Sequence, residues 1–370
     1  MKVDPRVLLV GPRGRRLCLD IAGSAIEGDS SHAAEEYRLA VGYAAYDLDP
    51  GRGTSRVMFS FGGGELVTPH PSPADVARLL DLLPLVEPDE GTLLRGLMAA
   101  VDFARYWQEP DGEDVLAAAP EMREALARVA ASVAQCPVAS WWTTPLDLAA
   151  QWAVTLMEGP SPPTAVTGTT RELLAHWHSA TVEDEARARR ERPRDPRASL
   201  SGTWWSTPPA ELTRTTRSLG ELGPVGLWLV EDAFNWDRAT ARHVSAPHDV
   251  TVYEVEGPEA WAELCRRYPL EVTASRRHDW YRTTGIDARW VIPDWSRVAE
   301  DFDAVHVTAL GYLTTAGRAV AVAAAEDMYT VLAGWNPDQT YWLTDSTAPA
   351  SVEQTWRRND RDSAWSQSAS

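Results

Sequence analysis

Two side chains in the C-terminal half of the sequence, Glu254 and His306, have the chemistry of a general acid or base. Glu254 lies within an alternating run over residues 249–255, which is typical of a strand. On a buried face this carboxylate would have a shifted pKa and would be a catalytic candidate; on an edge strand it would lie in solvent. His306 alternates with valines over residues 303–308, where it is either a hydrogen-bonded core residue or a base. The sequence leaves both alternatives open.

Arginines cluster at residues 276–282, Arg-Arg-His-Asp-Trp-Tyr-Arg, in an otherwise acidic chain. Guanidinium groups match the oxygens of a phosphate, so Arg277 is a candidate for binding an anion such as a pyrophosphate. The same arginines could instead pair with the surplus of carboxylates.

Tryptophans occur in two similar segments, Ser-Trp-Trp-Thr-Thr-Pro at 140–145 and Thr-Trp-Trp-Ser-Thr-Pro at 203–208. Each pattern predicts a strand end followed by a helix with threonine and proline at its start. The pairs either pin these corners by packing or present one tryptophan each to a shared cleft.

Composition excludes several classes of protein. The 370 residues carry 35 basic and 53 acidic side chains, a net charge of −18, and Lys2 is the only lysine. This charge makes sequence-independent binding of nucleic acid unfavourable. No apolar run approaches the roughly 20 residues of a membrane span, and the first residues do not resemble a secretory signal. The three cysteines are widely spaced, so we expect neither a disulfide framework nor a metal site, and the simplest location is a reducing cytoplasm. The use of arginine in place of lysine suggests a GC-rich bacterial genome.

The elements that must position these residues divide the sequence into regions. The fold class expected is α+β, with an N-terminal small β-sheet, a helical region and a C-terminal split-sheet α+β domain. The N-terminal region, 1–70, is predicted as a hairpin over 5–22 and strands over 37–46 and 55–61, followed by a glycine turn at 62–64. The helical region, 71–190, has helices predicted over 72–83, 92–107, 121–134 and 171–190.

Residues 191–202 contain two prolines and alternating charges, which indicates a linker before a C-terminal domain over 203–346. Strands are predicted there at 204–207, 225–230, 249–255, 290–295, 303–308 and 329–332, and helical segments at 208–217, 236–241 and 259–267. Residues 347–370 are polar and are expected to form a flexible tail.

Three segments of the C-terminal half resemble an ADP-ribosyltransferase-like fold, a small split-sheet structure that holds NAD in a cleft. The first segment, residues 226–232 with Trp236 and Ala239, resembles the family's strand-then-helix segment. The second, residues 302–307, resembles its "YDGV" strand. The third, residues 329–332 with 335–339, resembles its closing strand. The likeness covers residues 200–345. The family's first strand carries an arginine or histidine, whereas residues 204–207 here have neither.

The resemblance implies roles for particular residues. The family's catalytic glutamate lies just before the closing strand, where Glu326 is the nearest match, and Glu254 is the alternative carboxylate. Arg217 or Arg277 would hold the pyrophosphate of NAD, and His306 would orient the substrate. Nucleotide-binding positions are expected at Trp204, Trp205, Ser206, Trp228 and Tyr253.

Two functions therefore follow as hypotheses. One is an NAD-dependent transferase or NAD-cleaving enzyme, with NAD as substrate and a protein or small molecule as acceptor. The alternative is a non-catalytic module that binds a nucleotide-like ligand or a protein through a tryptophan-rich cleft.

Overall fold

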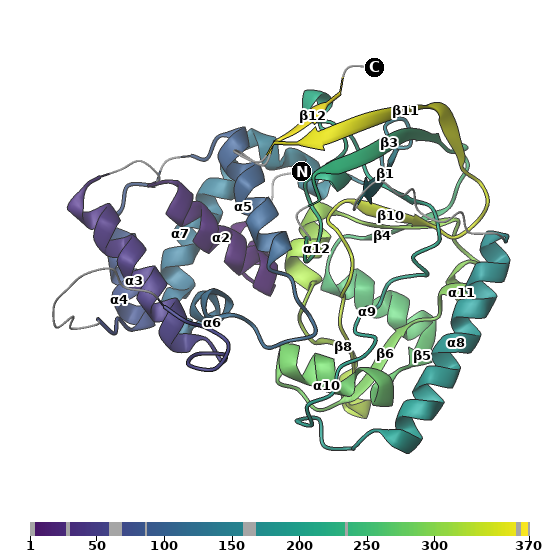
Figure 1. Ribbon diagram of the computed structural model, residues 1–370, viewed down its shortest axis with the longest axis horizontal. Coiled ribbons are helices and arrows are strands. Elements are labelled where there is room, and N and C mark those ends of the chain that lie inside the picture. The colour runs from purple at the N-terminus through teal and green to yellow at the C-terminus, as the bar shows by residue number, and fades with distance from the viewer. Residues whose placement is uncertain are drawn as a thin grey trace. The chain divides into compact units, whose positions relative to one another are not determined.

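The computed structural model describes residues 4–26, 30–58, 69–85, 87–157, 168–233, 236–359 and 364–368 (Figure 1). The chain divides into two compact units. The first contains Met1–Ala100 and Gln108–Trp141, and the second contains Val101–Trp107 and Trp142–Ser370. Helices make up the first unit, whereas the second combines sheets and helices, so the predicted α+β class is confirmed.

The prediction of an N-terminal β-sheet is wrong, because the described residues that were expected to form its strands are mainly helical. The hairpin expected over 5–22 is replaced by α1 (Pro5–Leu8) and α2 (Pro12–Ser24). Pro12 takes the first position of α2, where its missing N–H costs nothing. Gly14 packs so closely on α1 that a Cβ there would lie 1.8 Å from the Leu8 carbonyl oxygen. The Gly-Pro-Arg-Gly segment is therefore a helix start and not a turn.

The second predicted strand is also a helix, α3 (His32–Leu48). The Ser31 hydroxyl accepts a hydrogen bond from the backbone N–H of Ala34 and caps it, and Tyr37, Ala40 and Ala44 are buried at helical spacing. Residues 55–58 form no strand; Arg56 only makes an isolated bridge with Arg52. Residues 59–61 and the glycines at 62–64 lie outside the described residues.

The remaining helices of the first unit follow the predicted pattern more closely. Ser72 and Asp75 form the capping box that opens α4, as the sequence predicts. These elements are α4 (Pro73–Leu82), α5 (Glu90–Asp102), α6 (Gly112–Ala118), the 3₁₀ turn η1 (Pro120–Met122), α7 (Arg123–Gln135) and the 3₁₀ turn η2 (Pro137–Thr143). The 3₁₀ turn η2 replaces the strand end that was expected at Trp141 and Trp142.

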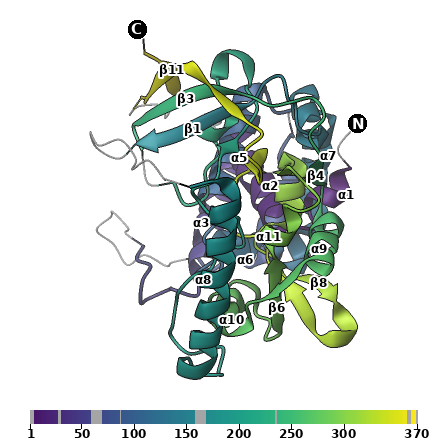
Figure 2. The ribbon, with the colours of Figure 1, turned by 90° about the vertical axis from the view of Figure 1, so that its right-hand side faces the viewer.

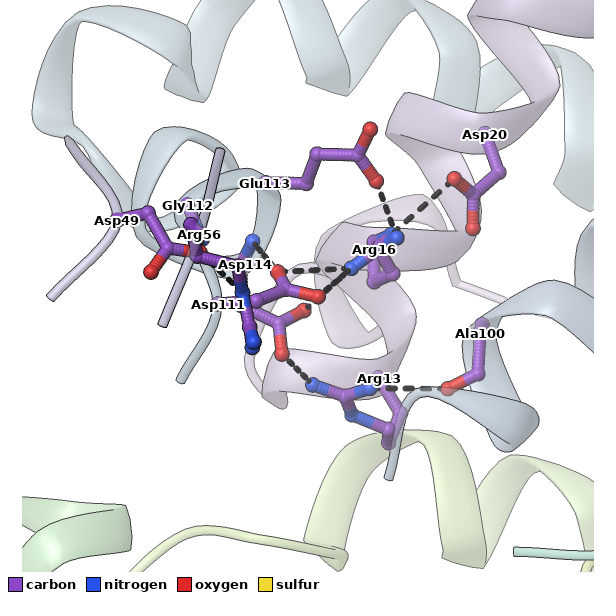
Figure 3. A network of polar contacts seen from close by, with 10 residues as sticks. All are labelled: Arg13, Arg16, Asp20, Asp49, Arg56, Ala100, Asp111, Gly112, Glu113 and Asp114. Carbon is purple, nitrogen blue, oxygen red and sulfur yellow. Dashed lines mark hydrogen bonds and ion pairs between the residues drawn. The ribbon is translucent and has the colours of Figure 1, made fainter. Parts of the chain in front are cut away.

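A network of ion pairs joins α2 to α6 (Figure 3). Arg13 pairs with Asp114 and donates to the Ala100 carbonyl. Arg16 faces four carboxylates, those of Asp20, Asp111, Glu113 and Asp114. Burial lowers the pKa of Arg16, but the four carboxylates raise it by more, so this guanidinium stays charged.

The described residues form three four-stranded sheets, all in the second unit. The first is antiparallel in the order β1-β3-β11-β12, and Figures 1 and 2 show β1, β3 and β11 side by side. Its strands are β1 (Trp152–Met157), β3 (Arg238–Ser245), β11 (Ala348–Arg358) and β12 (Trp365–Gln367). Trp356 and Trp365 pack on Leu227, Ala239 and Ala241 beneath it.

This sheet overturns three predictions. The helical turn expected over 236–241 is largely β3, because Ala239 and Ala241 are buried at the period of two that a strand requires. The strand expected over 225–230 is only the 3₁₀ turn η4 (Val225–Leu227), whose apolar side chains are buried without strand pairing. The expected tail over 347–370 instead forms β11 and β12, because its tryptophans complete the core.

The second sheet has the order β2-β10-β7-β4, with β4 parallel to β7 and the other pairs antiparallel. Its strands are β2 (Arg214–Thr215), β4 (Val252–Val255), β7 (Ala304–Val307) and β10 (Gln339–Trp342). The helix expected over 208–217 is absent from these described residues, since Pro208 and Pro209 supply no backbone donors and β2 pairs with β10 instead.

The third sheet has the order β5-β6-β9-β8, from β5 (Pro269–Glu271), β6 (Arg289–Pro293), β8 (Val320–Ala323) and β9 (Met328–Thr330). Helices of the same unit are α8 (Thr170–Glu191), α9 (Pro258–Arg267), α10 (Thr273–Thr284), α11 (Trp295–Val298) and α12 (Ala309–Thr315), and its other 3₁₀ turns are η3 (Gly220–Leu222) and η5 (Ala324–Glu326).

Fully buried tryptophans fill the core of the second unit: Trp261, Trp295 and Trp335 pack on one another, and Trp280 lies edge-on to Trp290. Most of the tryptophan excess is thus explained by packing.

Candidate active site

Three polar side chains lie next to one another on neighbouring strands of the second sheet. Glu254 on β4 is in register with His306 on β7, and His306 is in register with Thr340 on β10. Residues in register project from the same face of a sheet. The register therefore brings a carboxyl group, an imidazole and a hydroxyl group together.

An ion pair borders this row. Asp338 lies just before β10 with a positive φ of 59°, and Arg217 lies two residues after β2. The Asp338 carboxylate accepts from Arg217 Nε at 2.5 Å and from the Arg217 backbone N–H at 2.9 Å. Arg217 also donates to the carbonyls of Thr144 and Pro145, at 3.2 and 3.1 Å. The guanidinium is thus held on both sides.

His306 is completely buried between these groups. Its Nδ1 is 2.9 Å from Thr340 Oγ1, and its Nε2 is 3.6 Å from Asp338 Oδ1 and 3.9 Å from Glu254 Oε2. Among the described residues, Nε2 has no hydrogen-bond partner. Burial, followed by the positive charge of Arg217, lowers the pKa of His306 to about 3, so the imidazole is neutral at physiological pH.

Glu254 has one oxygen held and one oxygen without a partner. Its Oε1 accepts from the Leu146 backbone N–H at 2.9 Å, whereas Oε2 makes no hydrogen bond to a described residue. Burial raises the pKa of Glu254 to about 7, against the lowering effect of the Leu146 N–H, and the charges of Glu256 and Asp338 raise it further. Its side chain is 22% exposed and that of His306 only 1%, so Glu254 is the more accessible of the two.

Asp338 is the second carboxyl group with a raised pKa. Burial raises it to about 6, although Arg217 opposes the shift by its charge and its hydrogen bonds. Two carboxyl groups that titrate near neutrality beside a neutral imidazole form an arrangement suited to proton transfer.

The other predicted catalytic residue, Glu326, lies apart from this cluster. It is exposed at the end of η5, next to β8 and β9 of the third sheet. No interaction among the described residues joins it to Glu254 or His306. Tyr253 adjoins Glu254 in β4 but projects from the opposite face, where its hydroxyl donates to the Ala260 carbonyl at 2.7 Å. Burial raises the pKa of Tyr253 to about 12.

Arg277 lies on α10, where its guanidinium donates to the backbone carbonyls of Thr273 and Arg194. Its neighbour Arg276 is buried near Asp184, which supports the pairing alternative for that arginine. The structure does not bring either of them to the Glu254 cluster.

The aromatic positions lie in separate places. Trp228 is packed under the first sheet and donates from Nε1 to the Leu222 carbonyl. Trp204 meets Trp205 edge-on at 5.7 Å between ring centroids, and Ser206 is buried in hydrogen bonds to the backbone of Ala333. Trp205 alone of these is well exposed, at 42%. In the described residues, Trp204 and Trp205 contact each other, and no ring contact joins either of them to Trp228.

Sequence reasoning missed Asp338, Thr340 and the Leu146 N–H as parts of the site. The Pro337-Asp338 turn before a strand was the available signal for a residue in an unusual backbone conformation. The register that joins Thr340 to His306 has no local signature.

No group of three or more metal-ligating side chains that could hold a metal ion occurs in the described part of the chain. No described helix is both long and apolar enough to cross a membrane. Comparisons with protein-family models, with curated proteins and with solved structures found no match.

Proposed function

We propose that the chain is an enzyme that cleaves the nicotinamide–ribose bond of NAD or a related nucleotide, with Glu254 as its catalytic carboxylate. The observation that carries this proposal is the environment of Glu254, a half-buried carboxyl group with one oxygen fixed by Leu146, the other without a partner, and a pKa near 7. The order of sequence segments that resembles ADP-ribosyltransferases supports the choice of substrate.

The chemistry requires a carboxylate and no metal. When the bond between the ribose C1′ and the nicotinamide nitrogen breaks, its electron pair neutralises the pyridinium, and nicotinamide leaves without being protonated. Positive charge develops on the ribose, where a carboxylate stabilises it. Water or an acceptor hydroxyl then attacks C1′, and its proton passes to Glu254, whose pKa suits that role.

His306 is a positioning residue in this proposal. With a pKa of about 3 it is a weak base, and the contact of its Nδ1 with Thr340 holds the neutral ring beside both carboxyl groups, with Nε2 3.9 Å from Glu254 Oε2 and 3.6 Å from Asp338 Oδ1. The Arg217–Asp338 pair holds the neighbouring strand end in place.

The test is release of free nicotinamide from NAD, followed by chromatography, for the unaltered protein, Glu254→Gln and Glu326→Gln. Both substitutions remove one carboxylate, so Glu326→Gln is a matched control at an exposed site. We expect Glu254→Gln to lower the rate at least about 100-fold and Glu326→Gln to leave it unchanged. No release above buffer by the unaltered protein would overturn the function, and equal loss in both variants would overturn the role of Glu254.

A pH series separates this mechanism from general acid catalysis. If Glu254 acts as an ionised carboxylate, the rate should rise as the pH increases through about 7. A rate that falls over the same range would assign Glu254 the role of a proton donor.

The alternative proposal is a non-catalytic binding module, and the exposed Trp205 beside Trp204 is the observation in its favour. An exposed ring can stack on a nicotinamide or adenine ring. Saturable binding of NAD that Trp205→Ala abolishes, without any nicotinamide release, would favour the module.

We also propose a cytoplasmic location, since all three cysteines are free and buried.

A further inference from the structure

A cavity of about 630 Å³ lies wholly within the first unit, remote in sequence from Glu254. It is bounded by α1, the start of α2, the end of α6 and the first turns of α7. This volume falls in the range of roughly 300–1,000 Å³ that is usual for small-molecule sites.

The lining of the cavity combines cations with an apolar surface. Three arginines, Arg6, Arg15 and Arg123, and one acid, Glu124, contribute its charges, a balance of 3 − 1 = +2. The rest of the lining is apolar, from Pro5, Leu9, Val10, Leu126 and alanines of α6 and α7. The lining thus carries a charge opposite in sign to the net charge of −18 of the whole chain.

These arginines are placed differently from the buried ones of the same unit. Arg13 and Arg16 meet carboxylates directly, whereas neither Arg6 nor Arg123 forms an ion pair with any described residue. Both arginines are exposed, and Arg123 follows the 3₁₀ turn η1 directly at the start of α7. Their guanidinium groups are therefore open to an anion that enters the cavity from solvent.

Arg15 has a structural task beside the cavity. Its Nη1 donates to the carbonyls of Leu9 and Val10, both at 3.1 Å, and so fixes the link between α1 and α2. It still contributes its charge to the lining.

We infer that this cavity binds a small organic anion, a molecule with an apolar body and one carboxylate, sulfonate or phosphate group. The apolar body would lie against Leu9, Val10 and Leu126, and the anionic group would face Arg6 and Arg123. The inference is independent of the proposed function of Glu254.

The test compares two probes with the same aromatic body, 8-anilinonaphthalene-1-sulfonate and the uncharged N-phenyl-1-naphthylamine. Fluorescence titration of the full chain is expected to give one saturable site that binds the sulfonate at least about tenfold more tightly than the neutral probe. Equal affinities, or binding without saturation, would overturn the inference.

Variants locate the site. The double variant Arg6→Ala/Arg123→Ala should weaken the sulfonate about tenfold or more and leave the neutral probe unchanged. Arg78→Ala, at an exposed position on α4 outside the lining, is the matched control and should change neither affinity. Unchanged sulfonate affinity in the double variant would overturn the site.

A second variant tests the cavity itself. Ala118→Phe places a ring at an exposed lining position of α6, so it should abolish binding of both probes while the thermal unfolding midpoint stays the same. Retained binding of either probe in a folded Ala118→Phe protein would contradict the location.

Discussion

Two buried polar clusters, one in each unit, are built on different principles. In the first unit, Arg16 is surrounded by four carboxylates and Arg13 pairs with one of these, Asp114, so every carboxylate of the cluster has a guanidinium partner (Figure 3). Each cluster retains a buried atom without a hydrogen-bond partner among the described residues, Asp20 Oδ2 in the first unit and Glu254 Oε2 and His306 Nε2 in the second. Glu254, however, forms no ion pair with an arginine of the described residues, whereas Asp20 pairs with Arg16. Guanidinium groups that pair with several carboxylates fasten helices together, whereas a buried carboxyl group without a cationic partner costs stability and is a candidate for function.

Both clusters contain carboxyl groups that titrate near neutrality, so a shifted pKa alone does not separate them. Burial raises the pKa of Asp20 to about 7, although Arg16 opposes the shift, and it raises that of Glu254 to about 7 as well. The difference is the partner: Asp20 accepts from Arg16 Nε at 3.1 Å, whereas Glu254 is held only by one backbone N–H. This comparison predicts how each cluster responds to substitution.

The largest effect is expected for Arg16→Met. It removes a buried guanidinium from among four carboxylates and should lower the free energy of unfolding by about 3–5 kcal/mol, measured by urea denaturation followed by circular dichroism. A loss below about 1 kcal/mol would contradict the structural role of the network.

Arg217→Met should rank second, with a loss of about 2–4 kcal/mol at pH 8, because it leaves Asp338 buried without its cation. Without Arg217 the carboxyl group of Asp338 can avoid this cost by binding a proton, so the loss should shrink at pH 5. The control is Arg217→Met/Asp338→Asn, which removes both charges and should regain part of the stability. A loss of the same size at both pH values would contradict the pairing.

Glu254→Gln should raise the free energy of unfolding, whereas the two arginine substitutions should lower it. The folded-state pKa of Glu254 is raised from 4.5 to about 7, so its contribution to stability is present below pH 4.5 and is lost as the pH rises through 7. The variant should therefore be more stable than the unaltered protein by about 1–3 kcal/mol at pH 8, and the difference should vanish near pH 4.5. Thermal unfolding across this pH range measures the effect, and a destabilised variant at pH 8 would contradict it.

The smallest effect is expected for Asp81→Asn, which removes the charge of an exposed ion pair with Arg128 in the first unit and leaves the hydrogen bonds of Arg128 to the Leu80 and Leu83 carbonyls in place. Pairs of this kind contribute little, so the free energy of unfolding should change by less than about 0.5 kcal/mol. A loss comparable to that of Arg16→Met would show that burial does not separate the two kinds of pair.

The sequence predicted the strands of Glu254 and His306 because each alternates with valines over several residues. It did not predict the helices of the N-terminus, since short apolar runs such as Val7-Leu8-Leu9-Val10 fit a strand as well as a buried helix. The partners of Arg16 on α6 are about 95 residues away in sequence, and no local pattern announces such pairs. The meeting of Asp338 with His306 depends likewise on strand register, which only the folded sheet defines.

The short segment Thr144–Leu146 has a consequence for how this sequence can change over time. It holds Arg217 through two backbone carbonyls and Glu254 through one backbone N–H, so most of its contacts come from atoms that nearly every residue type possesses. Many replacements of the Leu146 side chain would keep its contact with Glu254, and proline, which lacks the N–H, would remove it. Adding or deleting one residue would move all three contacts at once. We therefore expect the residue types of this segment to vary among homologous sequences, while the number of residues in it stays the same.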